Sequence, residues 1–172
     1  MSQDDLFEQV LYTFGAALGR LARSYEADPE KRRDLLQEIH LATWRSLAIF
    51  DHQCSLRTWV YRVAHNVGAS HVVTHRRAKA RALVTLDDLE HLPDLADTES
   101  AVDRQMTLER LYRLIQQLQA VDREVILLYL DGLDAVSIAE ITGISSTNVA
   151  TKVHRIKKIL TSRFEEGGCH AS

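Results

Sequence analysis

The sequence predicts an all-α protein in which an acidic linker joins two small helical domains, and three observations support that prediction. The 172 residues include only two prolines and seven glycines, so long stretches lack the residues that interrupt helices. Apolar residues recur at spacings of three and four, the period of an amphipathic helix. Residues 83–103 lack that pattern. We therefore expect helical domains at residues 5–82 and 104–164, and a disordered tail at residues 165–172.

The composition excludes several classes of protein. Apolar residues make up 45% of the chain and charged residues 26%, which is typical of soluble globular proteins. No apolar run approaches the ~20 residues that span a bilayer, and the acidic start lacks the layout of a secretion signal. We therefore expect a cytoplasmic protein without membrane insertion. Two cysteines, with no Cys/His cluster of zinc spacing, predict no disulfide framework, no metal and no cofactor.

The charges are unevenly distributed along the chain. No carboxylate lies between Asp51 and Asp87, a stretch with several arginines and lysines. From Asp87 to Asp103 there are seven acidic residues and no lysine or arginine, and a second basic cluster follows in the last predicted helix. This pattern predicts two anion-binding surfaces on a tether. The net charge of −3 does not exclude nucleic-acid binding, because the local field decides it.

In the N-terminal domain, a helix is predicted to start shortly after Pro29. Its buried stripe is expected to consist of Leu36, Ile39, Thr43, Leu47 and Phe50. The outer face then carries Asp34, Glu38, Leu41 and Arg45, with Gln37 at its margin. A leucine among these polar groups indicates a protein-binding surface.

A second helix of this domain is predicted to begin after Ser55, which can cap it. The expected buried face is Leu56, Val60, Val63, Ala64 and Val67, and the other face holds Thr58, Trp59, Arg62, His65 and Asn66. Aromatic, amide and guanidinium groups without nearby acids suit unstacked bases and phosphates. A core role for Trp59 is an equally weighted alternative. The segment "HRRAKAR", with Arg76 and Arg77, extends the cationic surface.

The C-terminal domain is predicted to contain four helices. The first runs over residues 100–118, and the second starts near Val121, with Asp122 as its cap and Gly132 after its end. A short helix at 134–142 leads to Gly143, which can adopt the positive φ of a tight turn. Ser145 is a natural N-cap for the last helix.

The last helix is predicted to have two contrasting faces. Val149, Val153, Ile156 and Leu160 recur at spacings of 4, 3 and 4, so they share a buried face. The opposite face is hydrogen-bonding and cationic: Thr147, Asn148, Thr151, Lys152, Arg155 and Lys158. A short helix, a glycine turn and a longer basic helix are typical of a helix-turn-helix. The alternative is an ordinary bundle helix with a solvated charged face.

Two long segments resemble a known family. "DLLQEIHLATWRSLAIFD…SLRTWVYRVAHN" is similar to region 2, and "VDREVILLYLDGLDAVSIAEITGISSTNVATKVHRIKKIL" to region 4, of the extracytoplasmic-function sigma factors of bacterial RNA polymerase. The resemblance implies a non-enzymatic protein that binds core RNA polymerase and promoter DNA. It also implies that region 2 recognises and melts the −10 element, while region 4 sets its last helix into the major groove of the −35 element.

The resemblance further implies roles for particular residues. The polymerase-binding set is Asp34, Gln37, Glu38, Leu41 and Arg45. The −10 set is His52, Gln53, Cys54, Ser55, Arg57, Thr58, Trp59, Arg62, Asn66, Arg76 and Arg77. The −35 set comprises Ser146, Thr147, Asn148 and Thr151 for base edges, and Lys152, Arg155, Lys157 and Lys158 for phosphates.

One departure concerns polymerase binding. Lys31, Arg32 and Arg33 stand where the family usually carries acidic residues. Each resulting like-charge opposition costs on the order of 1 kcal/mol near a surface. Our hypothesis is that core binding is weak until negative charge is added, for example by a kinase that phosphorylates Thr43 or Ser46.

The resemblance leaves other regulation open. An anti-sigma factor is the family's usual partner. Cys54, in the expected specificity loop, is either an ordinary thiol, which we favour, or an oxidant sensor.

Two alternative functions stay open at this point. A helix-turn-helix regulator that binds duplex DNA without polymerase explains the C-terminal domain but gives Gln37, Glu38 and Trp59 no role. A sigma-like decoy or adaptor that starts no transcription is compatible with the basic residues 31–33.

Overall fold

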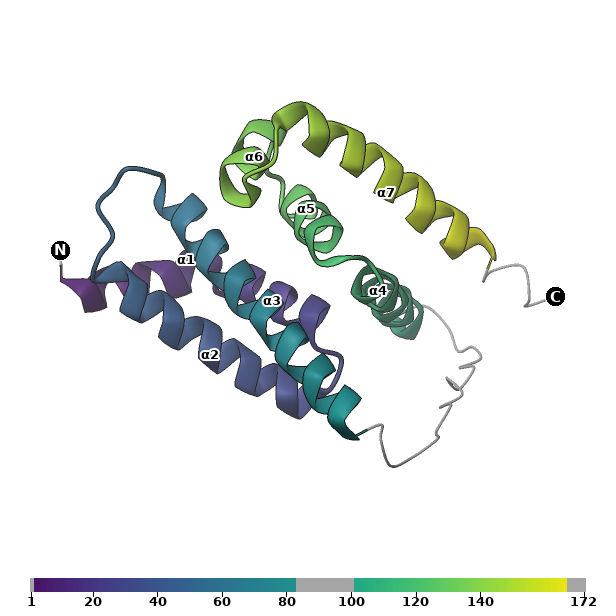
Figure 1. Cartoon of the computed structure of the whole chain (residues 1–172), viewed down its shortest axis with the longest axis horizontal. Helices are drawn as coiled ribbons and strands as arrows, with labels where there is room; N and C mark the ends of the chain where they lie inside the picture. The colour runs from purple at the N-terminus through teal and green to yellow at the C-terminus, as the bar shows by residue number, and fades with distance from the viewer. Residues whose placement is uncertain (1, 83–100, 167–172) are drawn as a thin grey trace.

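The computed structural model describes residues 2–82 and 101–166, and the side chains of residues 2–75 and 104–164 (Figure 1). Within these ranges the chain forms seven helices and no strand, which confirms the predicted all-α class. Most of the expected linker, residues 83–100, and the expected tail from residue 167 onward lie outside the described residues. No helix in the described part is both long and apolar enough to cross a membrane.

Helices α1 (Gln3–Tyr25), α2 (Pro29–Leu47) and α3 (Leu56–Ala82) form the N-terminal half. Ser2 and Asp5 form a capping box at the start of α1. Asp28 caps α2 by accepting the N–H groups of Glu30 (2.9 Å) and Lys31 (3.1 Å). The three helices pack side by side around fully buried side chains that include Val10, Leu18, Leu35, Ile39 and Val60.

The predicted faces of α2 and α3 need two corrections. Leu35, not Leu36, is the fully buried leucine of α2, while Leu36 is half-buried at the edge of the core. On α3, Thr58 and His65 are buried rather than exposed. Helix α1, which was not among the individually predicted helices, packs on both α2 and α3, and its Tyr25 holds His65. Thr58 is buried because it bonds to Ser55 in the cap of α3.

Helices α4 (Ala101–Gln116), α5 (Ala120–Leu130), α6 (Ala135–Thr142) and α7 (Ser146–Glu166) form the C-terminal half. Helix α4 thus begins inside the segment that was expected to be linker. Gly132 and Gly143 have φ values of 80° and 77°, as predicted for the residues that follow α5 and α6. The cap of α5 was predicted wrongly, because Gln119 occupies the N-cap position without a side-chain bond.

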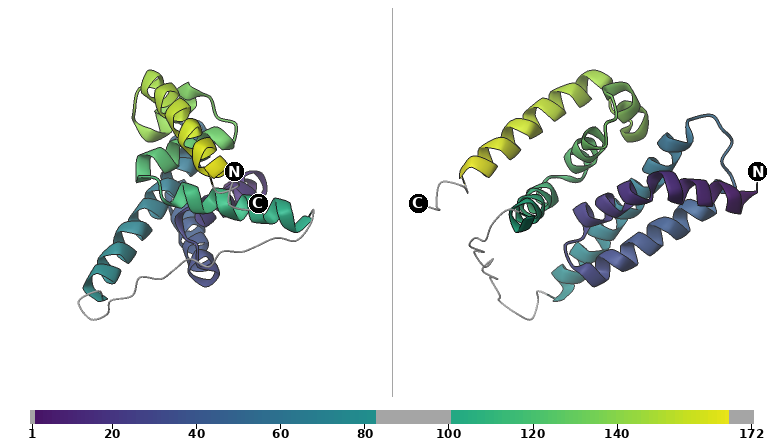
Figure 2. Two further views of the ribbon diagram at one scale, coloured as in Figure 1. Left: turned by 90° about the vertical axis from the view of Figure 1, so that its right-hand side faces the viewer. Right: turned by 180° about the vertical axis from the view of Figure 1, so that it is seen from behind.

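The two halves pack against each other (Figures 1 and 2). Helix α3 contacts α6, and α1 contacts α4. Arg23 on α1 pairs with Glu109 on α4, and the Gln116 amide donates to the Arg23 carbonyl at 2.8 Å. A cavity of about 200 Å³ remains between the halves, lined by Leu21, His65 and several residues of α4 and α5. The lining of this cavity is mostly apolar, and the polar contacts lie beside it. An interface that leaves a cavity is less well packed than a domain core, which favours separation of the halves.

Candidate nucleic-acid interface

The exposed face of α7 presents small hydrogen-bonding groups near its N-terminus. Val149 and Ile156 are 1% and 0% exposed, so they anchor the helix on α5 and α6. Ser145 caps the helix, and its hydroxyl accepts the Asn148 N–H at 3.3 Å. The four residues expected to contact base edges are all exposed: Ser146, Thr147, Asn148 and Thr151. Helix α6, the Gly143 turn and α7 together have the predicted helix-turn-helix arrangement.

The cations of α7 are partly engaged within the C-terminal half. Lys152 Nζ and Arg155 Nη2 each lie 2.7 Å from a different carboxylate oxygen of Asp122. Lys157 Nζ lies 5.4 Å from the centre of the Tyr129 ring. Asp122 therefore orients two of the four expected phosphate contacts instead of capping α5. Arg155 remains 56% exposed, so its guanidinium is still accessible to an anion.

The outer face of α2 has the exposure that a docking surface requires. Asp34, Gln37, Glu38, Leu41 and Arg45 are all exposed, and 47% of Leu41 is accessible. Lys31 and Arg33 are exposed on the preceding turn, and Arg32 is half-buried. The structure thus brings the polymerase-binding set together along one helix, beside the three basic residues.

The two hydroxyls considered for phosphorylation are not exposed on this surface. Thr43 is 0% exposed. The Ser46 hydroxyl is part-buried and donates to the Thr43 carbonyl at 2.8 Å, while it accepts the indole N–H of Trp59 at 3.0 Å. A kinase cannot reach Thr43 in this conformation, so the Thr43 suggestion is wrong for the folded chain, and Ser46 is already bonded on both sides.

The loop between α2 and α3 carries an aromatic cluster. His52 has a φ of 61°, which is uncommon for a residue other than glycine. Its ring lies 4.4 Å from that of Phe50, which in turn lies 5.3 Å from Trp59. His52, Gln53 and Ser55 are exposed. Trp59 is half-buried, and its indole N–H donates to the Ser46 hydroxyl. It therefore packs partly in the core, as the alternative interpretation of this residue predicted.

Two residues of α3 that were expected to face outward have internal roles. The Ser55 hydroxyl accepts the Thr58 N–H at 3.0 Å and lies 2.9 Å from the Thr58 hydroxyl. Thr58 is 4% exposed, so it belongs to the helix cap and is not available to DNA. His65 is 2% exposed, and its Nδ1 lies 3.0 Å from the hydroxyl of Tyr25. Burial lowers the pKa of His65 to about 3, so its ring is neutral.

The arginines of α3 are turned toward the C-terminal half. Arg57 Nη2 donates to the Asp131 carbonyl at 3.0 Å, and Arg62 Nη2 donates to the Glu140 carbonyl at 2.6 Å. Asn66 is exposed. Arg76 and Arg77 lie on α3, but their side chains are outside the described set. Two of the expected −10 contacts are thus already occupied by the protein itself.

Asp131 contacts both α1 and α3 of the N-terminal half, which the sequence did not reveal. Its Oδ1 accepts from Arg20 Nη2 at 2.6 Å, and its Oδ2 accepts from the Tyr61 hydroxyl at 3.1 Å. The local sequence indicated only a helix end at this position, and no pattern links it to residues 70 or more positions away.

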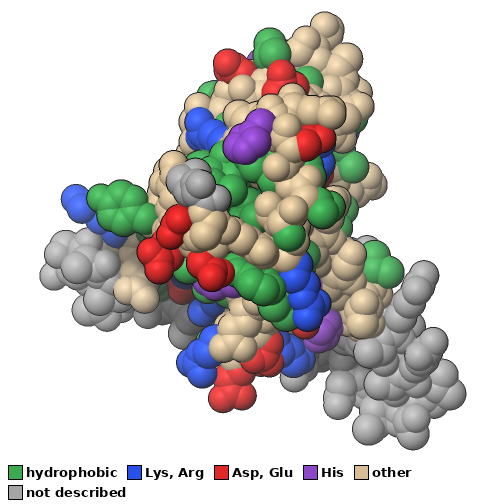
Figure 3. Space-filling view, turned by 90° about the vertical axis from the view of Figure 1, so that its left-hand side faces the viewer, with side chains coloured by type: hydrophobic (Ala, Val, Ile, Leu, Met, Phe, Trp, Pro, Cys, Tyr) green, Lys and Arg blue, Asp and Glu red, His purple; other side chains and the backbone are tan. Residues whose placement is uncertain are grey.

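Seen from the N-terminal end of the molecule, acidic, basic and hydrophobic side chains are interspersed, without one dominant charged patch (Figure 3).

Comparisons with known families match both halves of the chain. The family described as Sigma-70 region 2 matches residues 13–78, and that described as Sigma-70, region 4 matches residues 108–160. The RNA polymerase sigma factor NccH of Alcaligenes xylosoxydans xylosoxydans is 26% identical over 164 residues, 92% of this chain and 87% of that protein. The ECF RNA polymerase sigma factor SigX of Bacillus subtilis (strain 168) is 27% identical, over 94% of this chain and 81% of that protein.

Solved structures share the fold. The sigma factor RpoE of Bartonella quintana, solved in complex with the anti-sigma factor NepR, has a TM-score of 0.68 at 22% identity, covering 91% of this chain and 94% of that one. CnrH, solved in complex with the cytosolic domain of CnrY, has a TM-score of 0.67 at 20% identity, covering 93% and 88%. With both sigma regions in the expected order and relatives of this kind matched over more than four fifths of their length, the chain belongs to the extracytoplasmic-function sigma factors.

Proposed function

We propose a division of labour between the two halves of this sigma factor. As a member of its family, the chain directs promoter-specific initiation by core RNA polymerase. Residues 5–82 act as region 2, which docks on the polymerase and melts the −10 element. Residues 104–164 act as region 4, which binds the −35 element, and residues 83–103 join them. The site of action is then the cytoplasm, where the polymerase is.

The exposed face of α7 is the observation that carries the −35 assignment. Ser146, Thr147, Asn148 and Thr151 are exposed on the first two turns of a helix whose other side is fixed by Val149. Short polar side chains allow the end of a helix to approach base edges in the major groove. Arg155 and Lys158 follow on the exposed side, where they suit phosphates on the groove walls.

The −10 assignment rests on the loop with exposed His52 and Gln53, and on Arg57, Arg62 and Asn66 of α3. Extracting a base from the duplex costs a few kcal/mol, which stacking and cationic contacts must offset. Arg57 and Arg62 are exposed, but each donates one bond to a carbonyl of the C-terminal half, at Asp131 and Glu140. Separation of the two halves frees both guanidinium groups entirely, so we propose that it precedes the binding of single-stranded DNA.

The polymerase assignment rests on the row of exposed side chains along α2, with Leu41 as its apolar member. Tyr12, on the neighbouring helix α1, is 95% exposed. An accessible apolar residue bordered by acids and amides suits a protein partner better than DNA, because the carboxylates of Asp34 and Glu38 repel phosphates. An anti-sigma factor is the second protein partner we propose, since both structural neighbours were solved with proteins bound.

Run-off transcription with purified core polymerase, followed by mapping of start sites, tests the assignments. The Asn148→Ala variant is expected to lose roughly 5- to 150-fold in initiation at mapped promoters, because one good base contact contributes roughly 1–3 kcal/mol. Thr161→Ala, on an exposed position of the last turns of α7, is the matched control and is expected to retain activity. Polymerase binding without any defined start site would instead establish the decoy function.

A further inference from the structure

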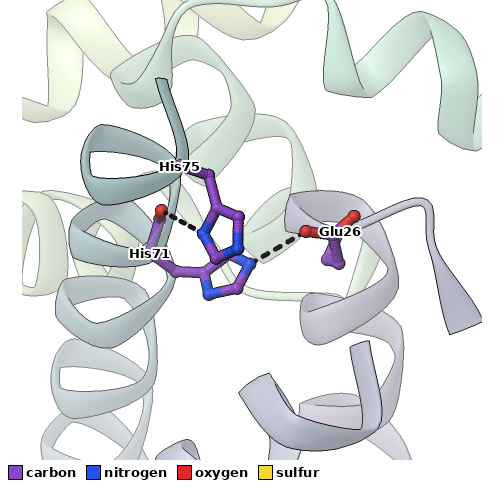
Figure 4. A group of neighbouring side chains, drawn as sticks. All are labelled: Glu26, His71 and His75. Atoms are coloured by element: carbon purple, nitrogen blue, oxygen red, sulfur yellow. Dashed lines mark hydrogen bonds and ion pairs between the residues drawn. The ribbon is translucent and has the colours of Figure 1, made fainter. Parts of the chain in front are cut away.

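Three side chains suited to metal binding meet on the N-terminal half, beside a groove that is also lined by Glu38 and Asn66 of the proposed contacts. Glu26 follows the last residue of α1, and His71 and His75 lie one turn apart on α3 (Figure 4). Each offers one ligand atom, and these atoms all lie within 4.8 Å of one another. Residues four apart share a helix face, so both imidazoles reach the same carboxylate. No sequence motif indicated this group, because Glu26 is 45 positions from His71 and no cysteine is involved.

Hydrogen bonds to the surrounding backbone orient two of the three side chains. Glu26 Oε1 accepts the Asp28 N–H at 3.0 Å, while Oε2 lies 2.9 Å from His71 Nε2. His75 Nδ1 lies 3.1 Å from the His71 carbonyl. Because a carbonyl only accepts, Nδ1 carries the proton and the lone pair is on Nε2. Such outer bonds are the usual means by which proteins orient metal-binding histidines and carboxylates.

Burial and charge favour a bound cation at this place. The side chains of His71 and Glu26 are 7% and 16% exposed, so little water has to be removed from them. The Glu26 carboxylate supplies negative charge beside the two imidazoles. His75 is exposed and borders a groove of about 370 Å³, also lined by Asn66, Ser70 and Thr74, through which an ion can enter.

We propose that Glu26, His71 and His75 form a binding site for a divalent transition-metal ion, with Zn²⁺ as the best match. Two imidazole nitrogens and one carboxylate oxygen are ligands that Zn²⁺ accepts at about 2.0–2.2 Å, and a fourth position is left for water. Bonds of that length place tetrahedral ligands roughly 3.3 Å apart. The Glu26–His71 pair already has a similar separation, and exposed His75 can close the remaining distance by rotating its side chain. Mg²⁺ and Ca²⁺ prefer all-oxygen sites and do not match two imidazoles.

The bound ion joins the end of α1 to the middle of α3. This cross-link lies within the N-terminal half, so it forms whether or not the two halves are separated. Metal binding is therefore expected to raise the thermal stability of this half. The proposal does not depend on the promoter contacts assigned above.

The test is titration of chelator-treated, full-length protein with ZnCl₂ by calorimetry. All proteins carry Cys54→Ser, Cys169→Ser and His170→Ala, so that thiols and the C-terminal histidine do not contribute. We expect one equivalent of Zn²⁺ to bind, with affinity at least 10-fold weaker in His75→Gln and in Glu26→Gln. His154→Gln, which alters an exposed histidine on α7, is the matched control and is expected to bind as the parent does. Equal affinity in the parent and in His75→Gln overturns the proposal.

A second measurement separates a metal site from the plain Glu26–His71 ion pair. Zn²⁺ is expected to raise the unfolding temperature of the parent protein but not that of His75→Gln, and Co²⁺ to give the visible absorption of a tetrahedral complex in the parent alone. His75 is exposed and takes no part in the ion pair, so this variant is expected to fold normally. The opposite result is that Glu26→Gln lowers the stability of the metal-free protein, but Zn²⁺ changes the unfolding temperature of neither the parent nor the variant. In that case the Glu26–His71 pair is only structural and the proposal fails.

Discussion

The hydroxyl of Tyr61 donates a hydrogen bond of 3.1 Å to the carboxylate of Asp131, 70 positions further along the chain. The same carboxylate accepts from Arg20 at 2.6 Å. Burial, and then the charge of Asp131, raise the pKa of Tyr61 to about 12, so its hydroxyl stays a donor. One acid of the C-terminal half thus holds an arginine of α1 and a tyrosine of α3, next to the carbonyl that binds Arg57.

Replacing Asp131 by alanine is expected to shift the chain toward separated halves. Arg20 and Tyr61 lose their acceptor, while Arg57 keeps the backbone carbonyl. Because Arg20 is half exposed, we expect a modest loss of roughly 1–2 kcal/mol, which is a factor of about 5–30 in the equilibrium. Small-angle scattering is expected to show an enlarged radius of gyration.

Glu140→Ala is the matched control for this prediction. Arg62 bonds to the Glu140 carbonyl, so removal of the side chain leaves that contact in place. If Asp131→Ala scatters like Glu140→Ala, the Asp131 contacts do not hold the halves together.

Gly68→Ala is expected to destabilise the N-terminal half. A Cβ at this position lies 2.7–2.9 Å from ring atoms of Tyr25, and that ring is 7% exposed and hydrogen-bonded to His65. The ring cannot move freely, so we expect overpacking to cost roughly 1–3 kcal/mol. Gly19→Ala on α1, where a Cβ meets nothing within 4 Å, is expected to be neutral or stabilising by up to ~1 kcal/mol. Equal effects of the two substitutions in urea unfolding contradict the contact.

Glu124→Gln is expected to stabilise the protein above neutral pH but not in acid. Burial raises the pKa of Glu124 from 4.5 to about 7. Between pH 4.5 and pH 7 the folded chain keeps a proton on Glu124 that the unfolded chain releases. The stability that this protonated carboxyl group contributes is therefore complete below pH 4.5 and is lost as the pH rises through 7. Glutamine does not ionise. We expect a gain of roughly 2–3 kcal/mol at pH 8 and little change at pH 4.5.

The comparison of the two proteins at each pH isolates this carboxyl group. The depressed pKa of His65 makes both proteins less stable as the pH falls below 6.5, but it cancels in the difference. A difference in unfolding free energy that stays constant from pH 4.5 to pH 8 contradicts the assignment to Glu124.

Replacing Lys31, Arg32 and Arg33 by acidic residues is expected to strengthen binding to core polymerase. Lys31 and Arg33 are exposed beside the proposed docking face, and like charges near a surface oppose binding by on the order of 1 kcal/mol each. The increase is expected to shrink at high salt. The triple alanine variant is expected to have intermediate affinity. Unchanged or weaker binding of the acidic variant, measured by surface plasmon resonance, rules the repulsion out.

Local sequence signals predicted the C-terminal half well. Gly143 and Ser145 set the turn and cap of the last helix, and the spacing of Val149, Val153 and Ile156 fixed its buried face. These features depend on short-range geometry, which a sequence pattern records directly. The exposed set along α2 followed from the same periodicity.

Long-range packing accounts for what the sequence did not predict. Thr58 and His65 have polar side chains at positions that helical spacing assigned outward, yet the cap at Ser55 and the hydroxyl of Tyr25 take them into the interior. Asp122 was expected to cap α5, but two cations of α7, 30 or more positions away, hold it. The contacts of Asp131 with Arg20 and Tyr61, and the group of Glu26 with two histidines, depend on where α1 packs. The sequence pattern did not predict the position of that helix.

The most direct test of the account is the distance between the two halves in free protein and at a promoter. Energy transfer can be measured between dyes at Tyr12→Cys and Thr161→Cys, both exposed positions, in protein with Cys54→Ser and Cys169→Ser. We expect high transfer in the free chain and a clear decrease in the open complex with core polymerase and a mapped promoter. Unchanged transfer in a complex that initiates transcription would contradict the separation of the two halves on which the proposed function depends.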